Sequence, residues 1–132
     1  VGRSGKLLDR LMWEEVGLTR AECYIANVVK CRPPNNRDPA PNEIEACRPY
    51  LTAQIALIEP KVIVTLGNFS TKLLLDTSRG IRELRGQVFE RSDALLVPTY
   101  HPAYALRAGG EAMAEMRADF VRAKRLLGAA PA

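Results

Sequence analysis

The sequence predicts an α/β fold, a three-layer α/β/α sandwich built around a mainly parallel sheet. Short apolar runs that suit strands alternate along the chain with longer segments whose apolar residues recur at helical spacing. One of these runs, residues 61–66, is apolar on both faces, as strands in parallel sheets are. The length of 132 residues suits one core, so we expect residues 1–132 to form a single domain.

The composition indicates a globular protein. Hydrophobic residues make up 47% and charged residues 26%, which excludes an intrinsically disordered chain. No apolar stretch is long enough to cross a bilayer and no secretory signal opens the chain, so we expect a cytoplasmic protein. The net charge of +4 is compatible with a polyanionic partner but does not establish one.

The first part of the chain predicts a helix followed by a strand. Apolar residues fall on one face between Ser4 and Val16, with Ser4 as the expected N-cap and Gly17 as the end of the helix. The run at 24–29 predicts a short strand that contains one polar residue, Asn27.

A second helix is expected after a long proline-rich loop at 30–41. Asn42 is its expected N-cap, Glu45 stands at the capping-box position, and Pro60 ends it.

The second half of the chain continues the alternation. Its expected elements, in order, are a strand at 61–66, a short helix that starts at Gly67-Asn68 and runs to 75, a basic loop at 80–86, strands at 88–90 and 95–97, a loop at 99–104 and a helix at 111–127. In open parallel sheets ligands bind beyond the carboxyl ends of the strands. Asn27, Gly67 and His101 each lie where an expected strand ends, so we expect all three at that edge.

Asn27 and His101 each allow two interpretations. A buried amide costs about 1–3 kcal/mol unless its hydrogen bonds are satisfied, so Asn27 either satisfies nearby backbone or binds a ligand. His101 is the only histidine, and Pro102 favours an extended conformation at it. It is either an ordinary polar residue or a group that acts on a ligand, and the residues alone leave both questions open.

The three cysteines are Cys23, Cys31 and Cys47, an odd number that argues against a disulfide framework. Two thiolates can belong to a metal or cluster site, but such sites take four ligands. Spacing alone therefore favours three reduced thiols.

Four segments together resemble the iron–sulfur (family 4) uracil-DNA glycosylases in their order and spacing. They are VGRSGKLLDR at 1–10, YIANVVKCRPP at 24–34, ACRPYL at 46–51 and HPAY at 101–104. The run from Asn27 through Cys31, with Cys47 downstream, is the most specific of these features.

The resemblance implies a uracil-DNA glycosylase, a hydrolase of base excision repair that cleaves the N-glycosidic bond of a uracil flipped out of DNA. Asn27 matches the uracil-binding asparagine, whose amide complements O4 and N3–H of uracil and opposes the reversed pattern of cytosine. His101 matches the catalytic histidine, a donor that stabilises negative charge on O2.

The resemblance also implies a cofactor and a DNA surface. Cys31 and Cys47 match two of four ligands to a [4Fe–4S] cluster, whereas Cys23 is expected in the core. The residues implied to contact uracil-containing DNA, single- or double-stranded, are Arg85, Gly86, Pro102, Ala103, Tyr104 and Arg107. Among these, Arg85 and Gly86 match the family's loop that approaches phosphate. Ala105 stands where the superfamily often inserts a leucine into the base stack, and Leu106 follows it. We expect a monomer with no membrane partner.

Three family features are absent from the sequence: the Gly-Glu-x-Pro-Gly motif that positions water, an N-terminal cysteine pair, and an aromatic residue that stacks on uracil. We therefore expect an N-terminally truncated chain that is inactive by itself and holds a cluster poorly or not at all. The segment at 80–86 lacks the histidine of a crosslinking offshoot, which favours ordinary hydrolysis. The alternatives are a catalytically silent DNA- or nucleotide-binding remnant and a metal-free domain with inert cysteines.

Overall fold

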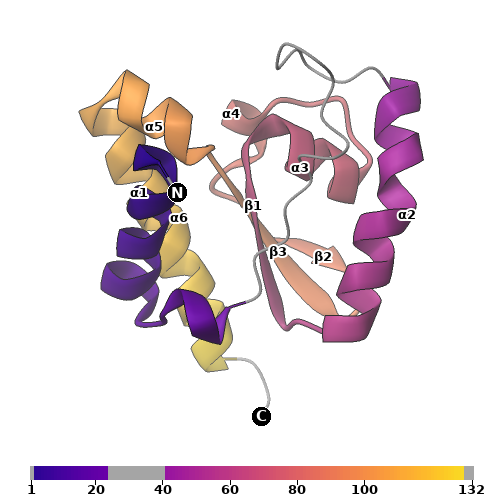
Figure 1. Ribbon diagram of the computed structural model, residues 1–132, viewed down its shortest axis with the longest axis horizontal. Coiled ribbons are helices and arrows are strands. Elements are labelled where there is room, and N and C mark those ends of the chain that lie inside the picture. The colour runs from indigo at the N-terminus through magenta and orange to yellow at the C-terminus, as the bar shows by residue number, and fades with distance from the viewer. Residues whose placement is uncertain (1, 24–40, 130–132) are drawn as a thin grey trace.

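The computed structural model describes residues 2–23 and 41–129, and in these residues helices and strands follow one another largely as the sequence predicts (Figure 1). The strand expected at 24–29 and nearly all of the proline-rich loop lie outside the described residues. No helix in residues 2–23 and 41–129 is long and apolar enough to cross a membrane.

The first helix is close to its predicted bounds. Helix α1 (Arg3–Leu11) continues into a π-helical turn, η1 (Met12–Val16), and Gly17 ends it in the left-handed region at φ 83°, as expected. The predicted N-cap was wrong, because the helix begins two residues earlier: Gly2 is the N-cap and Ser4 lies inside the first turn. A short 3-10 turn, η2 (Arg20–Glu22), follows.

Helix α2 (Pro41–Ile58) also begins earlier than predicted. Proline is favoured at the first position of a helix, and Asn42 therefore lies inside the first turn rather than at the N-cap. Glu45 does not close a capping box but pairs with Arg48 at 2.8 Å. The helix ends just before Pro60, as predicted.

The described sheet has three strands in the order β1-β3-β2. Strand β1 (Val62–Leu66) is parallel to β3 (Ala94–Thr99), with Leu66 opposite Thr99, whereas β2 (Phe89–Arg91) is antiparallel to β3. The pair expected to build a parallel sheet is therefore confirmed, and β2 makes the described part of the sheet mixed.

Pro98 lies within β3, the central strand, although proline cannot donate to a ladder. The register accounts for it. The backbone N–H of Leu95 donates toward β1, to the carbonyl of Lys61 at 2.9 Å, so the alternate positions 96 and 98 face β2. The pairing with β2 reaches only as far as Phe89 opposite Leu96. The missing N–H of Pro98 thus falls beyond that ladder.

Four further helices follow the strands. They are α3 (Gly67–Leu75), α4 (Ile81–Leu84), α5 (Pro102–Ala108) and α6 (Gly110–Ala129). Helices α3 and α6 were predicted. The segments at 80–86 and 99–104 were expected as loops, and both contain a short helix instead. Neither helix is long enough to show an apolar period in the sequence.

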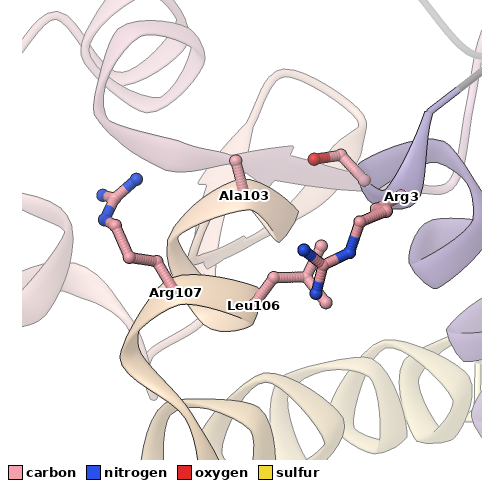
Figure 2. A pocket seen from close by; sticks show the side chains of 5 residues that line it. Arg3, Ala103, Leu106 and Arg107 are labelled. Carbon is pink, nitrogen blue, oxygen red and sulfur yellow. The ribbon is translucent and has the colours of Figure 1, made fainter.

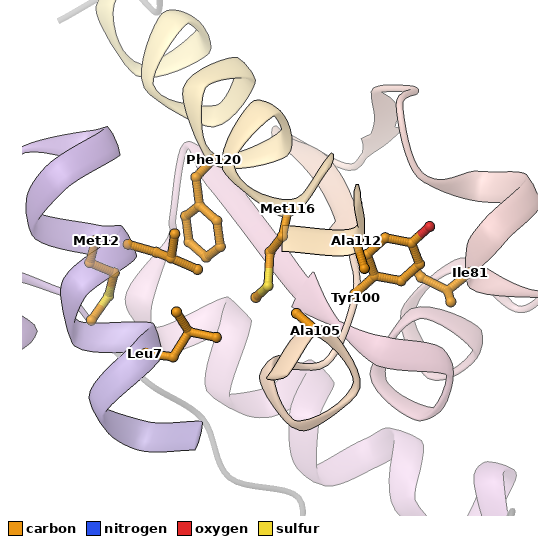
Figure 3. Packing of buried hydrophobic residues seen from close by; sticks show 9 residues of the cluster. Leu7, Met12, Ile81, Tyr100, Ala105, Ala112, Met116 and Phe120 are labelled. Atoms are coloured by element: carbon orange, nitrogen blue, oxygen red, sulfur yellow. The ribbon is translucent and has the colours of Figure 1, made fainter. Parts of the chain in front are cut away.

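Helices cover both faces of the sheet, which confirms the three-layer arrangement (Figure 1). Side chains alternate along a strand, and β1 accordingly sends Val64 and Leu66 to one core cluster and Ile63 to the other. The first cluster joins α1, α5 and α6 (Figure 3), and the second joins α2 and α3 to the sheet.

A buried ion-pair network joins the end of β3 to α6 and to the segment after α4. The Asp119 side chain is fully buried. It accepts two hydrogen bonds from Arg85, at 2.9 and 3.1 Å, one from Arg122 at 2.8 Å and one from the Thr99 hydroxyl at 2.7 Å. Arg85 also donates to Glu115 at 3.1 Å. A buried carboxylate is tolerated because its charge and lone pairs are satisfied in this way.

We predict that neutralising this carboxylate destabilises the fold. In Asp119→Asn, Arg85 and Arg122 lose the negative charge that they share, so the free energy of unfolding should fall by about 3–5 kcal/mol. The matched control is Glu83→Gln, which breaks an exposed pair with Arg79 and should cost less than about 1 kcal/mol. Urea unfolding measures the free energy of unfolding of both variants. If both lose the same amount, the buried ion pairs of Asp119 stabilise the fold no more than the exposed pair of Glu83 does.

Candidate functional site

The carboxyl ends of β1 and β3 bring Gly67 and His101 together. Leu66 lies opposite Thr99, and each strand ends at that residue. Gly67 has a φ of 87°, and a Cβ added to it would lie 3.0 Å from the Cβ of His101. Any other residue at position 67 would be strained and would press on the histidine. The expected meeting of Gly67 and His101 at this edge is therefore confirmed.

His101 is the N-cap of α5, in an extended conformation with φ −69° and ψ 139°. Its side chain is exposed, and Nδ1 accepts a hydrogen bond from the backbone N–H of Ala103 at 3.0 Å. Because Nδ1 is the acceptor, the proton of the neutral ring lies on Nε2. The neutral side chain of His101 is therefore a hydrogen-bond donor through Nε2 at the carboxyl edge of the sheet.

The two partners predicted for this edge and for the cluster are not described. Asn27 and Cys31 lie outside the described residues, so the pairing of Asn27 with His101 and that of Cys31 with Cys47 stay predictions.

The remaining cysteines differ in their surroundings. Cys47 is buried on α2, 3% exposed. Cys23 has a free thiol that packs against the first core cluster, as expected. Burial raises the pKa of this thiol, with a smaller contribution from Glu22, so Cys23 favours its protonated form. Within residues 2–23 and 41–129 no three His, Cys, Asp or Glu side chains gather as metal ligands.

The predicted phosphate loop at Arg85 and Gly86 has an unexpected side-chain arrangement. Arg85 is only 16% exposed, and its guanidinium nitrogens donate to Asp119 and Glu115. These bonds raise the pKa of Arg85, with the hydrogen bond to Asp119 as the largest cause. Gly86 is exposed at φ 88° with open space around it. A phosphate contact here stays a prediction, and Gly86 backbone is the more accessible part.

The predicted DNA-contacting run from Pro102 to Arg107 forms α5, not a loop. Pro102 is buried, Ala103 and Tyr104 are half-buried, and Arg107 is exposed. The Tyr104 hydroxyl accepts a hydrogen bond from Arg82 at 2.7 Å, and the Arg107 guanidinium lies 5.8 Å from the Tyr104 ring centroid. Basic side chains therefore contact this helix on its exposed side.

Residues of α1 and α5 line a shallow pocket. Arg3 and Ser4 line it from α1, and Ala103, Leu106 and Arg107 line it from α5 (Figure 2). Ala105 is fully buried in the first core cluster instead (Figure 3). Ala105 is therefore not available to enter a base stack, whereas Leu106, one residue on, is half-buried at the surface.

Two residues important to this arrangement, Arg82 and Asp119, were not singled out from the sequence. Neither had a local signal, because their roles depend on Tyr104 and Arg85, which lie far from them in the chain.

Comparisons with known proteins agree with this geometry. A model of the uracil DNA glycosylase superfamily matches residues 1–125. The chain is 48% identical over 114 residues to a type-4 uracil-DNA glycosylase of Sulfurisphaera tokodaii, covering 80% of this chain and 52% of that protein. The corresponding enzyme of Saccharolobus solfataricus is 49% identical over 114 residues, covering 80% and 53%.

The type-4 uracil-DNA glycosylase of Archaeoglobus fulgidus is 38% identical over 136 aligned positions, which cover 97% of this chain and 67% of that protein. The chain spans about half the length of the first two relatives and two thirds of this one. The chain belongs to the uracil DNA glycosylase superfamily and, within it, to the type-4 family.

Proposed function

We propose that the protein excises uracil from DNA by hydrolysing the N-glycosidic bond of a flipped-out nucleotide, as part of base excision repair. The observation that supports this most is the position of His101, held by Ala103 and by close contact with Gly67 at the carboxyl edge of the sheet. The proposed partner is uracil-containing DNA, the protein acts as a monomer, and the proposed compartment is the cytoplasm.

The role of His101 follows from how charge moves in the reaction. As the glycosidic bond breaks, negative charge develops on uracil O2 and positive charge on the sugar. An Nε2–H aimed at O2 stabilises that anion without transferring a proton, and the neutral ring needs no change of protonation to do so. The backbone contact at Nδ1 keeps the ring in the orientation and tautomer that the step requires.

The proposed role of Asn27 is to select uracil. A fixed side-chain amide donates to O4 and accepts from N3–H, and cytosine presents the reverse of both groups. With cytosine in the same position, the amide donor would face a donor and the amide acceptor would face an acceptor. These buried groups would lose their hydrogen bonds, which accounts for the discrimination against cytosine.

The residues of this chain do not by themselves fit a [4Fe–4S] cluster. Such a cluster takes four ligands, and the sequence has three cysteines, of which Cys23 is a protonated core thiol. We propose that Cys31 and Cys47 supply two ligands to a structural cluster, with two further ligands from outside these residues. No step of the proposed reaction depends on it.

We predict that His101 is needed for excision but not for folding. In the longest native protein that contains this chain, His101→Ala should lower kcat about 10²–10³-fold. His101→Asn is the matched control, because asparagine retains the N-cap of α5 but is too short to reach O2. We expect it to lose activity like the alanine variant while its unfolding midpoint stays unchanged. Full activity in His101→Asn would contradict the role of Nε2.

We predict that Leu106, not Ala105, supports base flipping. Leu106→Ala should lower excision from duplex DNA while leaving excision from single strands nearly unchanged, since only the duplex has a stack to fill. Ala105→Leu should instead overpack the core and reduce stability by about 1–3 kcal/mol. Assays of both variants on both substrates test this; a gain on duplex DNA in Ala105→Leu would reverse the assignment.

We predict that these 132 residues alone bind DNA without excising uracil at a useful rate. They contain no Gly-Glu-x-Pro-Gly motif to position water, and well-oriented groups supply up to about 7–11 kcal/mol of barrier reduction. The test compares the 132-residue chain with the longest native protein that contains it, on uracil-containing single-stranded DNA. Comparable turnover would show that the catalytic groups all lie within these residues.

A further inference from the structure

The described arginines fall into two groups by their ion pairs. Most have a carboxylate within 4.0 Å, namely Arg10, Arg20, Arg48, Arg79, Arg85, Arg117 and Arg122. Within residues 2–23 and 41–129, no carboxylate lies that close to the others, which are Arg3, Arg82, Arg91, Arg107 and Arg125. The second group is the one whose charge is available to a partner.

Three of these arginines gather around α5, although they come from α1, α4 and α5. Arg82 and Arg107 both contact Tyr104, with their guanidinium carbons 6.0 and 5.8 Å from the ring centroid. Arg3 and Arg107 line the same pocket (Figure 2). Like charges repel, so a group of cations without carboxylate partners destabilises the isolated fold. An anionic partner would relieve this repulsion by binding to the group.

We propose that Arg3, Arg82 and Arg107 together bind the phosphates of a DNA strand that crosses α5 beside His101. The proposal rests on the proposed function and adds Arg3 and Arg82 to its DNA surface. It also identifies Arg82, rather than the ion-paired Arg85, as the side chain through which the segment at 80–86 contacts phosphate.

Tyr104 orients two of the three cations. Its hydroxyl accepts from Arg82 at 2.7 Å, and its ring lies beneath Arg82 and Arg107. An arginine held in this way loses less conformational entropy on binding, because its side chain is already ordered. Tyr104 is therefore a positioning residue for phosphate contacts.

Leu106 fits the same surface. It lies between Arg3 and Arg107 in the pocket (Figure 2). An apolar side chain flanked by cations complements a DNA groove, whose rims are phosphates and whose floor is base edges. The arrangement thus places phosphate contacts on both sides of the residue proposed to enter the stack.

The experiment measures DNA affinity as a function of salt. Binding of the chain to fluorescent single-stranded oligonucleotides, with uracil or thymine at one position, is followed by anisotropy from about 50 to about 200 mM salt. The test variants are Arg3→Gln and Arg82→Gln. The matched controls are Arg91→Gln and Arg125→Gln, arginines that also lack a carboxylate partner among the described residues but lie on β2 and at the end of α6.

We expect each test variant to weaken binding to both oligonucleotides equally and to reduce the slope of log K against log salt by about 0.7. The controls should retain the slope of the wild type. Tyr104→Phe, which keeps the ring but loses the hydroxyl bond to Arg82, should weaken binding by a smaller factor at the same slope.

Two other results would overturn the proposal in distinguishable ways. If the wild type binds DNA and both test variants keep its slope, the surface around α5 is not the phosphate site, and the proposed function stands. If the wild type binds neither oligonucleotide at the lowest salt, both this inference and the proposed DNA partner fail.

Discussion

The enclosed carboxylate of Asp119 is the interaction on which the rest of the structure depends. A fully buried charge must be matched, and here Arg85, Arg122 and the Thr99 hydroxyl match it. These partners fix the last residue of β3 against α6 and against the segment that follows α4. Because Thr99 stands two residues before His101, the network that stabilises the fold also sets where the site begins.

Beyond Thr99, the position of His101 follows from backbone geometry. The parallel register of β1 and β3 brings Gly67 beneath the histidine, and only a residue without a Cβ permits the approach. Pro102 starts α5, and the Ala103 N–H fixes the imidazole through Nδ1. The ring is thus fixed through Nδ1, which leaves Nε2 as the donor that the proposed function requires.

The sequence predicted the layers and the edge of the sheet where His101 meets Gly67, because alternating periodicities and strand-to-helix glycines are local signals. It did not predict α4 or α5, which are too short to show a period. The phosphate contact that the resemblance implies for Arg85 stays a prediction, and the ion pair of Arg85 could not be foreseen because its partner, Asp119, is distant in the chain. The sequence left open whether Leu106 takes the role of the wedge or base flipping is less well supported, since spacing from His101 does not reveal that the helix turns Ala105 into the core.

The most direct test of the account uses the fact that His101 is the only histidine. In a protein labelled with nitrogen-15 at the imidazole, NMR gives a single pair of ring signals, so tautomer and ligand contact are read at one residue. The account predicts that the proton of the neutral ring lies on Nε2, and that the Nε2 signal shifts selectively when uracil-containing DNA is added. A ring with its proton on Nδ1, or an Nε2 signal unmoved by DNA that binds, would contradict it.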